Sequence, residues 1–380
     1  MTAFTRRNTA QSLDISLLVS TFERPANLRR TLFSIARQQR GKERFELIVT
    51  DDGSRDETAS LVARYAREVD FPVTFVTHPH DQFQLARCRN EGVAAARAPY
   101  LLFLDGDCVL SPDHVQQHLR HRTPGVTMAG DYYYLEREIS AGIDEQAILR
   151  GDFPVWPSWQ ERRRLIAKRI KSHFYRWLRV RSRPRLTGGN VGIWREDFER
   201  VNGYDQNFIG WGFEDRDLQY RLCRVGVRMQ SSLAWAHSYH LWHPRDPSFV
   251  RNGEGTQNRR YFFQPGRLTT PRNGLRQREL ADIAVAAVLP DEKQDWAAQL
   301  LGGRFGHCHG PAEVEIVFTP GTERFSGQAD CNVLVLLDQT PHRKLVRQAH
   351  IIVGGEDLQT PPHKPHFRLE QFEQALAAIV

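Results

Sequence analysis

Two aspartates, separated by a single residue, follow an apolar run in the chain. Residues 100–104 are apolar, and Asp105, Gly106 and Asp107 come directly after them. A run of this kind is typical of a buried parallel strand, and ligands bind at the carboxyl ends of such strands in open α/β sheets. Two adjacent carboxylates repel each other unless a cation lies between them, so the pattern predicts a site for a hard divalent ion bound to phosphate oxygens. A solvated turn after the strand is the alternative.

Expected strands and helices, which must position Asp105 and Asp107, alternate along the chain. A helix is expected after the second strand, with Ser54 or Asp56 as its cap. The other expected elements are strands at 13–19, 45–50, 73–76 and 100–104, and helices at 27–37 and 84–96. This alternation predicts a doubly wound, mostly parallel α/β sheet of nucleotide-binding type. Neither a Gly-x-Gly-x-x-Gly motif nor a P-loop follows the first strand.

Composition narrows the class of protein. The chain has 380 residues, which is room for one large α/β domain and a smaller one. Its net charge of +7 favours anionic partners such as nucleotides, nucleic acid or an anionic membrane. We expect a cytoplasmic protein, because no apolar run reaches the ~18 residues of a membrane span and residues 1–11 lack a signal-peptide core. The five scattered cysteines indicate reduced thiols, and an ordinary loop is favoured over a metal site at His307, Cys308 and His309.

Four motifs occur in order in the first part of the chain. They are Ser-Thr-Phe-x-Arg-Pro from Ser20, Asp-Asp-Gly-Ser from Asp51, Ala-Arg-Cys-Arg-Asn-Glu-Gly from Ala86, and Phe-Leu-Asp-Gly-Asp from Phe103. Their order and spacing resemble a family 2 glycosyltransferase with the GT-A fold. The resemblance implies a nucleotide-sugar donor, a divalent metal and inversion at the anomeric carbon.

The resemblance also implies where the donor binds. Asp51 or Asp52 suits base recognition, because a carboxylate can accept a hydrogen bond from uracil or ribose. Asp52 is similar to the family's uracil contact, with capping of the turn at Gly53 as the alternative. Arg89 matches a basic position of the family and is expected to contact the diphosphate, with a solvated helix face as its alternative. The expected donor contacts are Thr21, Glu23, Arg24, Asp51, Asp52, Arg89, Asp105 and Gly106.

A second informative block spans residues 186–218. Its segment Trp-Gly-Phe-Glu-Asp-Arg-Asp is similar to the Trp-Gly-Gly-Glu-Asp-x-Asp signature of galactosyltransferases and chondroitin synthases, with Phe213 in place of the second glycine. By this match Asp215 is the base that removes the acceptor proton, and Glu214 binds sugar hydroxyls. Asp217 would cap the following helix or favour its dipole; in the alternative, all three acids only begin a helix. The expected acceptor contacts are Gly189, Asn190, Trp211, Gly212 and Glu214.

Two histidines resemble the residues that complete the metal site in galactosyltransferases. His243 matches that position first and His240 second, so the expected metal ligands are Asp107, Asp105, His243 and His240. An imidazole beside carboxylates favours Mn²⁺ over Mg²⁺. Packing of the histidines beside Trp242 is the alternative.

Residues 159–185 combine many basic residues with apolar ones at helical spacing. This basic amphipathic helix suits an anionic membrane surface, and an anionic glycan, nucleic acid or simple packing on the sheet are the alternatives. Before it, residues 126–134 are expected to form one strand. The tyrosines Tyr132, Tyr133 and Tyr134 at its end would line a sugar site or pack in the core.

The alternation weakens after residue 265. We expect a helix at 275–288, strands at 313–318, 332–337 and 349–353, and a final helix at 369–380. The predicted organisation is a GT-A catalytic domain at 1–265, with a donor half at 1–135 and an acceptor half at 186–265 on either side of the basic helix. Residues 266–380 would form a small α/β accessory domain without recognisable chemistry.

These patterns predict a metal-dependent inverting glycosyltransferase. It would move a hexose or N-acetylhexosamine from a UDP-sugar to a glycan or lipid-linked acceptor in bacterial surface polysaccharide synthesis, in the cytoplasm or peripherally on the inner face of the plasma membrane. One alternative is a subunit of a processive polysaccharide polymerase. The other is a basic nucleic-acid- or membrane-binding protein without catalysis, and nucleic acid is disfavoured because the basic residues concentrate in one helix without a recognised motif.

Overall fold

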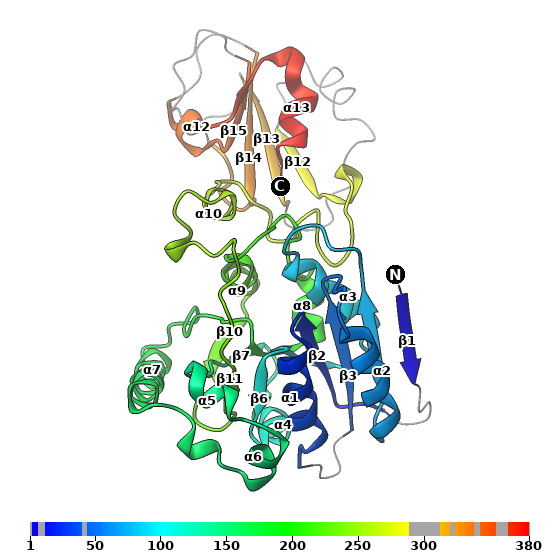
Figure 1. Ribbon diagram of the computed structural model, residues 1–380. Coiled ribbons are helices and arrows are strands. Elements are labelled where there is room, and N and C mark those ends of the chain that lie inside the picture. Colours follow the sequence, from blue (N-terminus) through cyan, green and yellow to red (C-terminus); the bar gives the residue numbers. More distant parts are fainter. Residues whose placement is uncertain are drawn as a thin grey trace. The chain divides into compact units, whose positions relative to one another are not determined.

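The computed structural model describes residues 2–6, 12–39, 44–288, 312–319, 324–337, 343–354 and 364–379 (Figure 1). The chain divides into two compact units, Met1–Arg259 and Arg260–Val380. The segment His307–His309 lies outside the described residues. Cysteines 88, 108, 223 and 331, which are described, are free. Among the described helices, none has the length and apolarity needed to cross a bilayer.

The first unit contains an eight-stranded mixed sheet. Neighbouring strands are parallel except for β1, which is antiparallel to β4, and β9, which is antiparallel to both β5 and β7. The predicted mostly parallel α/β sheet is confirmed, although its edge strand β1 was not expected. The order across the sheet is β1 (Thr2–Arg6), β4 (Val73–Thr77), β3 (Phe45–Asp51), β2 (Ile15–Thr21), β5 (Tyr100–Asp105), β9 (Asn190–Trp194), β7 (Val126–Ala129) and β10 (Arg228–Ser231).

Helices cover both faces of this sheet. Side chains alternate between the faces of a strand, so Leu17 and Leu18 point in opposite directions. Leu17 belongs to the core that includes Leu32 of α1 (Pro25–Ala36) and Val62 of α2 (Thr58–Glu68). On the other face α3 (Leu85–Ala95) packs so closely that a Cβ atom on its Gly92 would lie 3.0 Å from Leu18. The strands are therefore buried on both sides, as their continuous apolar runs predict.

The expected single strand at 126–134 is wrong. β7 ends at Ala129, and Tyr133–Tyr134 form β8 in a separate three-stranded sheet with β11 (Ser238–His240) and β6 (Cys108–Leu110). The chain turns away at Gly130, whose amide donates to the carbonyl of Asn190, and a Cβ atom there would lie 2.4 Å from the Asn190 side chain. Asn190, which is distant in sequence, therefore ends β7.

The expected cap of α2 is confirmed in part, because Asp56 binds the first amide of the helix and Ser54 does not. The residue before the helix is Glu57, without a side-chain cap. Asp56 accepts from the amide of Thr58 at 2.9 Å, whereas the Ser54 hydroxyl donates to Asp51 at 2.5 Å. Asp51, the last residue of β3, therefore binds the Ser54 hydroxyl, so Ser54 does not cap α2.

The remaining helices of the first unit connect and flank the sheets. α7 begins after Ser158, whose hydroxyl accepts from the amide of Glu161. It ends at Trp177, so the helix is shorter than the predicted range 159–185. The set comprises α4 (His114–His121), α5 (Arg137–Ala141), α6 (Glu145–Arg150), α7 (Trp159–Trp177), α8 (Arg195–Arg200), α9 (Glu214–Arg224) and α10 (Gln257–Phe262), of which α10 crosses the boundary between the units.

The second unit is built on a five-stranded parallel sheet, which confirms the predicted small α/β module. The expected helix at 275–288 is wrong, because its end forms β12, which pairs in parallel with the buried strand β13. Tertiary pairing outweighed the helical preference of the alanines. The elements are β12 (Val285–Val288), β13 (Val314–Thr319), β14 (Cys331–Leu336), α12 (Arg343–Gln348), β15 (Ile351–Val353), β16 (His366–Phe367) and α13 (Phe372–Ala377).

Candidate active site

The acid pair lies where β5 passes into β6. Asp105 ends β5, which pairs in parallel with β2, and Gly106 donates its amide to the Ser20 carbonyl at 2.8 Å. A Cβ atom on Gly106 would lie 2.9 Å from that carbonyl oxygen. Glycine therefore lets the chain pass close to β2, and Asp107 follows at the same end of the sheet.

The pairing of β11 with β6 brings two histidines to Asp107. His240 is paired with Cys108, and the next amide, of Leu241, donates to the Asp107 carbonyl at 2.8 Å. The Nε2 atom of His240 lies 3.4 Å from Oδ1 of Asp107, and Nε2 of His243 lies 3.0 Å from Oδ2. The two predicted histidines and the predicted aspartate therefore meet in space.

This cluster has the chemistry of a metal site. Ligand atoms of Asp107, His240 and His243 all lie within 4.8 Å of one another, as do those of Asp105, Asp107 and Cys108. Burial acts to raise the pKa of Asp107, but His240, His243 and Arg24 outweigh it and hold the pKa well below its ordinary value. One ionised carboxylate with two imidazoles fits a divalent ion that accepts both oxygen and nitrogen.

Arg24 lies beside the same cluster. Its Nη1 atom is 3.2 Å from Oδ2 of Asp107 and 3.3 Å from Nε2 of His243. A predicted donor contact is thus adjacent to the predicted metal ligands, and its guanidinium balances the charge of the carboxylate.

A second cluster surrounds Arg89. The guanidinium is only 2% exposed and donates to Asp215 at 2.8 Å and to Asp105 at 3.4 Å. It also lies 3.8 Å from Glu214 and 3.3 Å from the hydroxyl of Tyr204. Arg89 therefore joins the strand-end acid to the two acids at the start of α9, and its charge is balanced by these carboxylates.

The two acids of α9 lie in different surroundings. Asp215 accepts from the Gly188 amide at 2.8 Å and from the Tyr204 hydroxyl at 3.2 Å, besides Arg89. Burial, and then the charge of Asp215, raise the pKa of Glu214 to about 8. Oε2 of Glu214 is buried and has no hydrogen-bond partner among the described residues. Asp215 is thus held as an acceptor, whereas Glu214 is protonated near neutral pH.

Phe213, which precedes these acids, has a backbone conformation that glycine would adopt more easily. Its φ is +76°, in the left-handed region. A Cβ atom on Gly253 would lie 2.4 Å from the Phe213 ring, and the guanidinium of Arg216 lies 4.9 Å above that ring. These neighbours hold the strained residue in place.

The expected cap by Asp217 is wrong. Asp217 lies within the first turn of α9 and is fully buried in an ion pair with Arg221 at 2.8 Å. Its position still suits the dipole at the start of the helix.

The predicted acceptor residues are distributed around the Arg89 cluster. A Cβ atom on Gly189 would lie 2.4 Å from Oδ2 of Asp105, so the loop touches the acid pair. Asn190 is fully buried, with its side chain bonded to His118 at 3.0 Å. Trp211 is 42% exposed, and the carbonyl of Gly212 accepts from Asn258 at 3.0 Å. Trp211 is thus accessible to a sugar, whereas Gly189 and Asn190 are buried and the Asn190 side chain packs inside the protein.

The aromatic side chains of residues 132–134 differ in exposure. Tyr132 is buried with its ring 4.7 Å from that of His240, and Tyr134 is 46% exposed. Tyr133 stacks on Tyr239 with ring centroids 5.3 Å apart. Packing therefore accounts for Tyr132 and Tyr133, and Tyr134 has a surface that a sugar could contact.

Thr21 is the last residue of β2, and Glu23 lies in the loop that follows. The Oγ1 atom of Thr21 is buried without a hydrogen-bond partner among the described residues. Glu23 has a φ of +44°, and its amide donates to the hydroxyl of Ser54 at 2.8 Å. This contact ties the first loop to the Asp-Asp-Gly-Ser motif.

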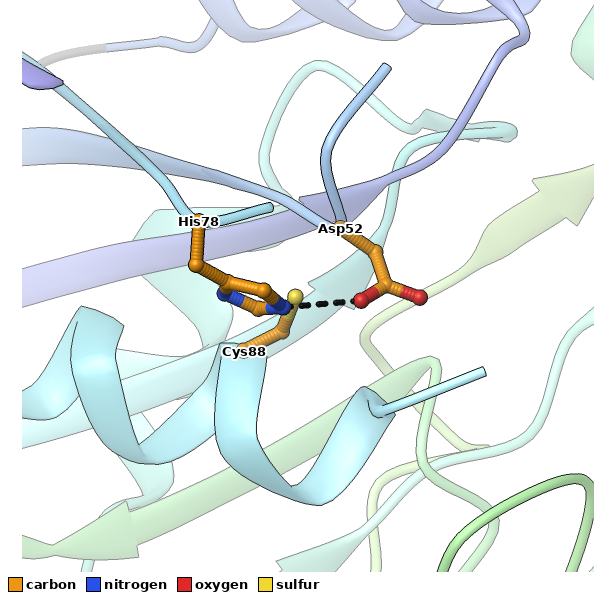
Figure 2. Close-up of side chains that lie close together, drawn as sticks. All are labelled: Asp52, His78 and Cys88. Atoms are coloured by element: carbon orange, nitrogen blue, oxygen red, sulfur yellow. Dashed lines mark hydrogen bonds and ion pairs between the residues drawn. The ribbon is translucent and has the colours of Figure 1, made fainter. Parts of the chain in front are cut away.

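The two aspartates predicted to recognise the base are both buried. Asp51 accepts from Thr77 at 2.8 Å, and Asp52 accepts from the amide of Gln84 at 3.1 Å. Oδ1 of Asp52 also lies 2.8 Å from Nε2 of His78 (Figure 2). The Nδ1 atom of His78 lies 2.8 Å from Glu91.

His78 therefore lies between two carboxylates. Burial lowers its pKa, but hydrogen bonds with Asp52 and Glu91 outweigh this effect and raise the pKa to about 9. Figure 2 also shows Cys88 beside the imidazole, and burial raises the pKa of this thiol well above its ordinary value. Both ring nitrogens are occupied and the thiol stays protonated, so the group fits a hydrogen-bonded network better than a metal centre.

Sequence reasoning missed His78 and Tyr204, and it did not predict the contact that Asn258 makes with Gly212. His78 follows β4, and the rule that ligand-facing residues follow parallel strands could have identified it. Tyr204 and Asn258 make their site contacts through partners distant in the sequence, at Arg89 and Gly212. No local pattern marks such partners.

A mostly parallel sheet with an acid pair after a central strand, and a second acid pair beginning a helix at the same end, defines the GT-A class of nucleotide-sugar-binding folds. Residues 16–136 match the family described as Glycosyl transferase family 2, and residues 168–244 match the N-terminal domain of galactosyltransferase. The first segment is therefore similar to family 2 glycosyltransferases and the second to the galactosyltransferase module, which are the two resemblances that the motifs predicted.

Named relatives agree with this assignment. Validoxylamine A glucosyltransferase of Streptomyces hygroscopicus subsp. limoneus is 34% identical over 236 residues, which cover 57% of this chain and 49% of the relative. Chondroitin synthase of Escherichia coli is 28% identical over 240 residues, covering 60% and 34%. The chain thus spans half or less of the length of these two relatives.

Solved structures with a similar arrangement include Staphylococcus aureus TarS 1–349 in complex with UDP-GlcNAc. It has a TM-score of 0.46 and 14% identity, with 66% of this chain and 65% of that chain covered. The mannosyltransferase PcManGT of Pyrobaculum calidifontis has a TM-score of 0.44 and 17% identity, with 62% and 59% covered.

Proposed function

We propose that the protein is a metal-dependent inverting glycosyltransferase that uses a UDP-sugar. The observation that carries the proposal is the convergence of Asp107, His240 and His243 at the carboxyl end of the sheet. These residues would hold the ion, with Asp105 beside it, and the donor set favours Mn²⁺ over Mg²⁺. When bound, such an ion would offset the charge of the departing diphosphate.

Asp215 is the proposed base. It would accept the proton of the acceptor hydroxyl as the hydroxyl oxygen bonds to the anomeric carbon and the bond from that carbon to the diphosphate breaks. Attack opposite the leaving group inverts the configuration. Arg89, Tyr204 and the Gly188 amide orient the carboxylate, and the protonated Glu214 would donate to a sugar hydroxyl.

The relatives and the site support a proposal for the donor. Relatives named as a glucosyltransferase, a hyaluronan synthase and chondroitin synthases support a hexose or N-acetylhexosamine donor. We propose a glycan or lipid-linked saccharide acceptor in bacterial surface polysaccharide synthesis. The proposed location is cytoplasmic, with peripheral contact with the inner face of the plasma membrane.

Thermal unfolding with UDP and Mn²⁺ tests the proposal. We expect a higher Tm with both together, and the increase should disappear with EDTA or in Asp107→Asn. Asp113→Asn is the matched control, because Asp113 lies at the start of α4 and bonds Gln117. A Tm increase with oligonucleotide alone would instead support the nucleic-acid-binding alternative.

Turnover across a panel of UDP- and GDP-sugars, each with candidate acceptors, would then identify the donor. Addition of one sugar to each acceptor molecule, without further extension, would distinguish a single transfer from a processive polymerase. Retention of the anomeric configuration in the product would contradict the proposed mechanism.

A further inference from the structure

The outward side of α7 carries an apolar stripe, which we define as Trp159, Ile166, Ile170, Phe174 and Trp177. These side chains are between 55% and 76% exposed. Because they are spaced three, four or seven residues apart, they lie on one side of the helix. Large apolar side chains that share one exposed side mark an interaction surface.

The opposite side of α7 fixes the orientation of the helix. Leu165 is buried, at 4% exposure. Arg164 donates to the carbonyl of Tyr132 at 2.7 Å and to Asp131 at 3.3 Å, and Lys168 pairs with the same aspartate. These contacts with the protein keep the apolar stripe turned outward.

Positive charge surrounds the stripe. Arg162, Arg163, Arg169, Lys171 and Arg176 are exposed. The guanidinium of Arg163 lies 5.0 Å above the Trp159 ring, within the stripe itself. All residues of α7 are described, and Glu161, its single acid, is paired with Arg164 at 2.8 Å. The outward side is therefore both apolar and cationic.

We propose that α7 lies in the plane of an anionic lipid surface, with the apolar stripe inserted at the level of the headgroups. Ile166 and Ile170 favour lipid over a soluble polyanion, because aliphatic side chains gain free energy by leaving water and cannot stack on bases. Trp159 and Trp177 suit the boundary between headgroups and acyl chains. The inference names the residues and the lipid chemistry of the proposed peripheral contact, and it does not depend on sugar transfer.

Co-sedimentation of the full chain with vesicles tests the inference. We expect binding to vesicles of phosphatidylcholine with phosphatidylglycerol, weak binding to phosphatidylcholine alone, and weaker binding at high salt. Ile170→Asp should reduce binding at least about tenfold, because it places a carboxylate in the stripe. Val155→Asp is the matched control, because Val155 is 72% exposed but lies outside α7.

Two further variants distinguish the contribution of positive charge on α7 from that of insertion of the apolar stripe. Arg169→Gln with Arg176→Gln should reduce binding to anionic vesicles on the order of tenfold or more. Tryptophan emission should shift to shorter wavelength with anionic vesicles, and Trp177→Phe should remove part of the shift. Unchanged far-UV circular dichroism and an unchanged Tm response to UDP and Mn²⁺ would show that each variant is folded.

Three results would overturn the inference. Equal vesicle binding by Ile170→Asp and the unchanged protein would show that the stripe does not insert. Binding of heparin that competes with vesicles and survives Ile170→Asp would indicate a polyanion site. A lower mass of Ile170→Asp by light scattering, without a change in vesicle binding, would indicate that the stripe contacts a second copy of the chain.

Discussion

The Nε2 atom of His243 lies 3.0 Å from Oδ2 of Asp107, although the two residues belong to segments that match different family models. β11 brings the histidine there by pairing with β6, directly after the aspartate. The two matched segments therefore share one cluster of candidate metal ligands.

His243→Ala should weaken the Mn²⁺-dependent part of UDP binding and lower turnover on the order of 10²-fold, because it removes a candidate ligand. Isothermal titration of UDP with and without Mn²⁺ measures the first effect. His173→Ala is the control, because this exposed histidine bonds only its own helix in the described contacts. An identical Mn²⁺ response in both variants would contradict the assignment of His243.

Asp215→Asn should lower turnover by about 10²- to 10⁴-fold and leave UDP binding nearly unchanged, because the amide cannot accept the acceptor proton. Steady-state transfer and UDP titration check the two parts. Normal turnover by this variant would show that another group is the base.

Glu214 predicts a pH effect on acceptor binding. Its pKa is raised to about 8, so the group is protonated below that pH and becomes a carboxylate above it. A second negative charge beside Asp215 and the loss of a donor should raise the KM for acceptor as pH passes 8. Glu214→Gln keeps a neutral donor, so it should flatten the KM profile; a profile identical to that of the unchanged protein would argue against this role.

Arg89→Leu should destabilise the fold by roughly 3–5 kcal/mol, because it leaves Asp105 and Asp215 without their buried counter-charge. Urea unfolding measures the loss. Arg87→Leu is the control, since Arg87 lies on the same helix, is 37% exposed and pairs with Glu91. The double variant Arg89→Leu with Asp215→Asn should regain part of the stability; exact additivity of the two losses would contradict the coupling.

His78 predicts a pH-dependent stability. Its pKa is raised from 6.5 to about 9 by its hydrogen bonds with Asp52 and Glu91. The contribution of the protonated ring, up to roughly 3 kcal/mol, is therefore complete below pH 6.5 and is lost as pH rises through 9. Unfolding free energies from pH 6 to 10 should fall less in His78→Asn than in the unchanged protein, and parallel profiles would exclude a charged His78.

Much of the architecture could be predicted because its signals are local. The apolar run before Asp105 defined β5, and turn residues marked the ends of the neighbouring strands. The break of the strand after Ala129 could not be predicted, because it depends on Asn190 packing against Gly130. β12 was missed for a similar reason, since only its pairing with β13 makes the segment a strand.

The residues of the candidate site also fall into two groups: those that local motifs indicate, and those that only contacts across the fold reveal. Asp105, Asp107 and Asp215 were identifiable from motifs, and His240 and His243 from their resemblance to known ligands. The roles of His78 and Tyr204 follow from contacts across the fold, and the Asp217–Arg221 pair shows that an acid in a motif can serve packing instead.

The position of Arg89 limits how the protein can open. A Cβ atom on Gly188 would lie 2.1 Å from the guanidinium, so the loop before β9 leaves no room for α3 to slide past it. The same side chain holds Asp105 on one side and Asp215 on the other. Hinge motion between these elements would therefore break a buried charged network.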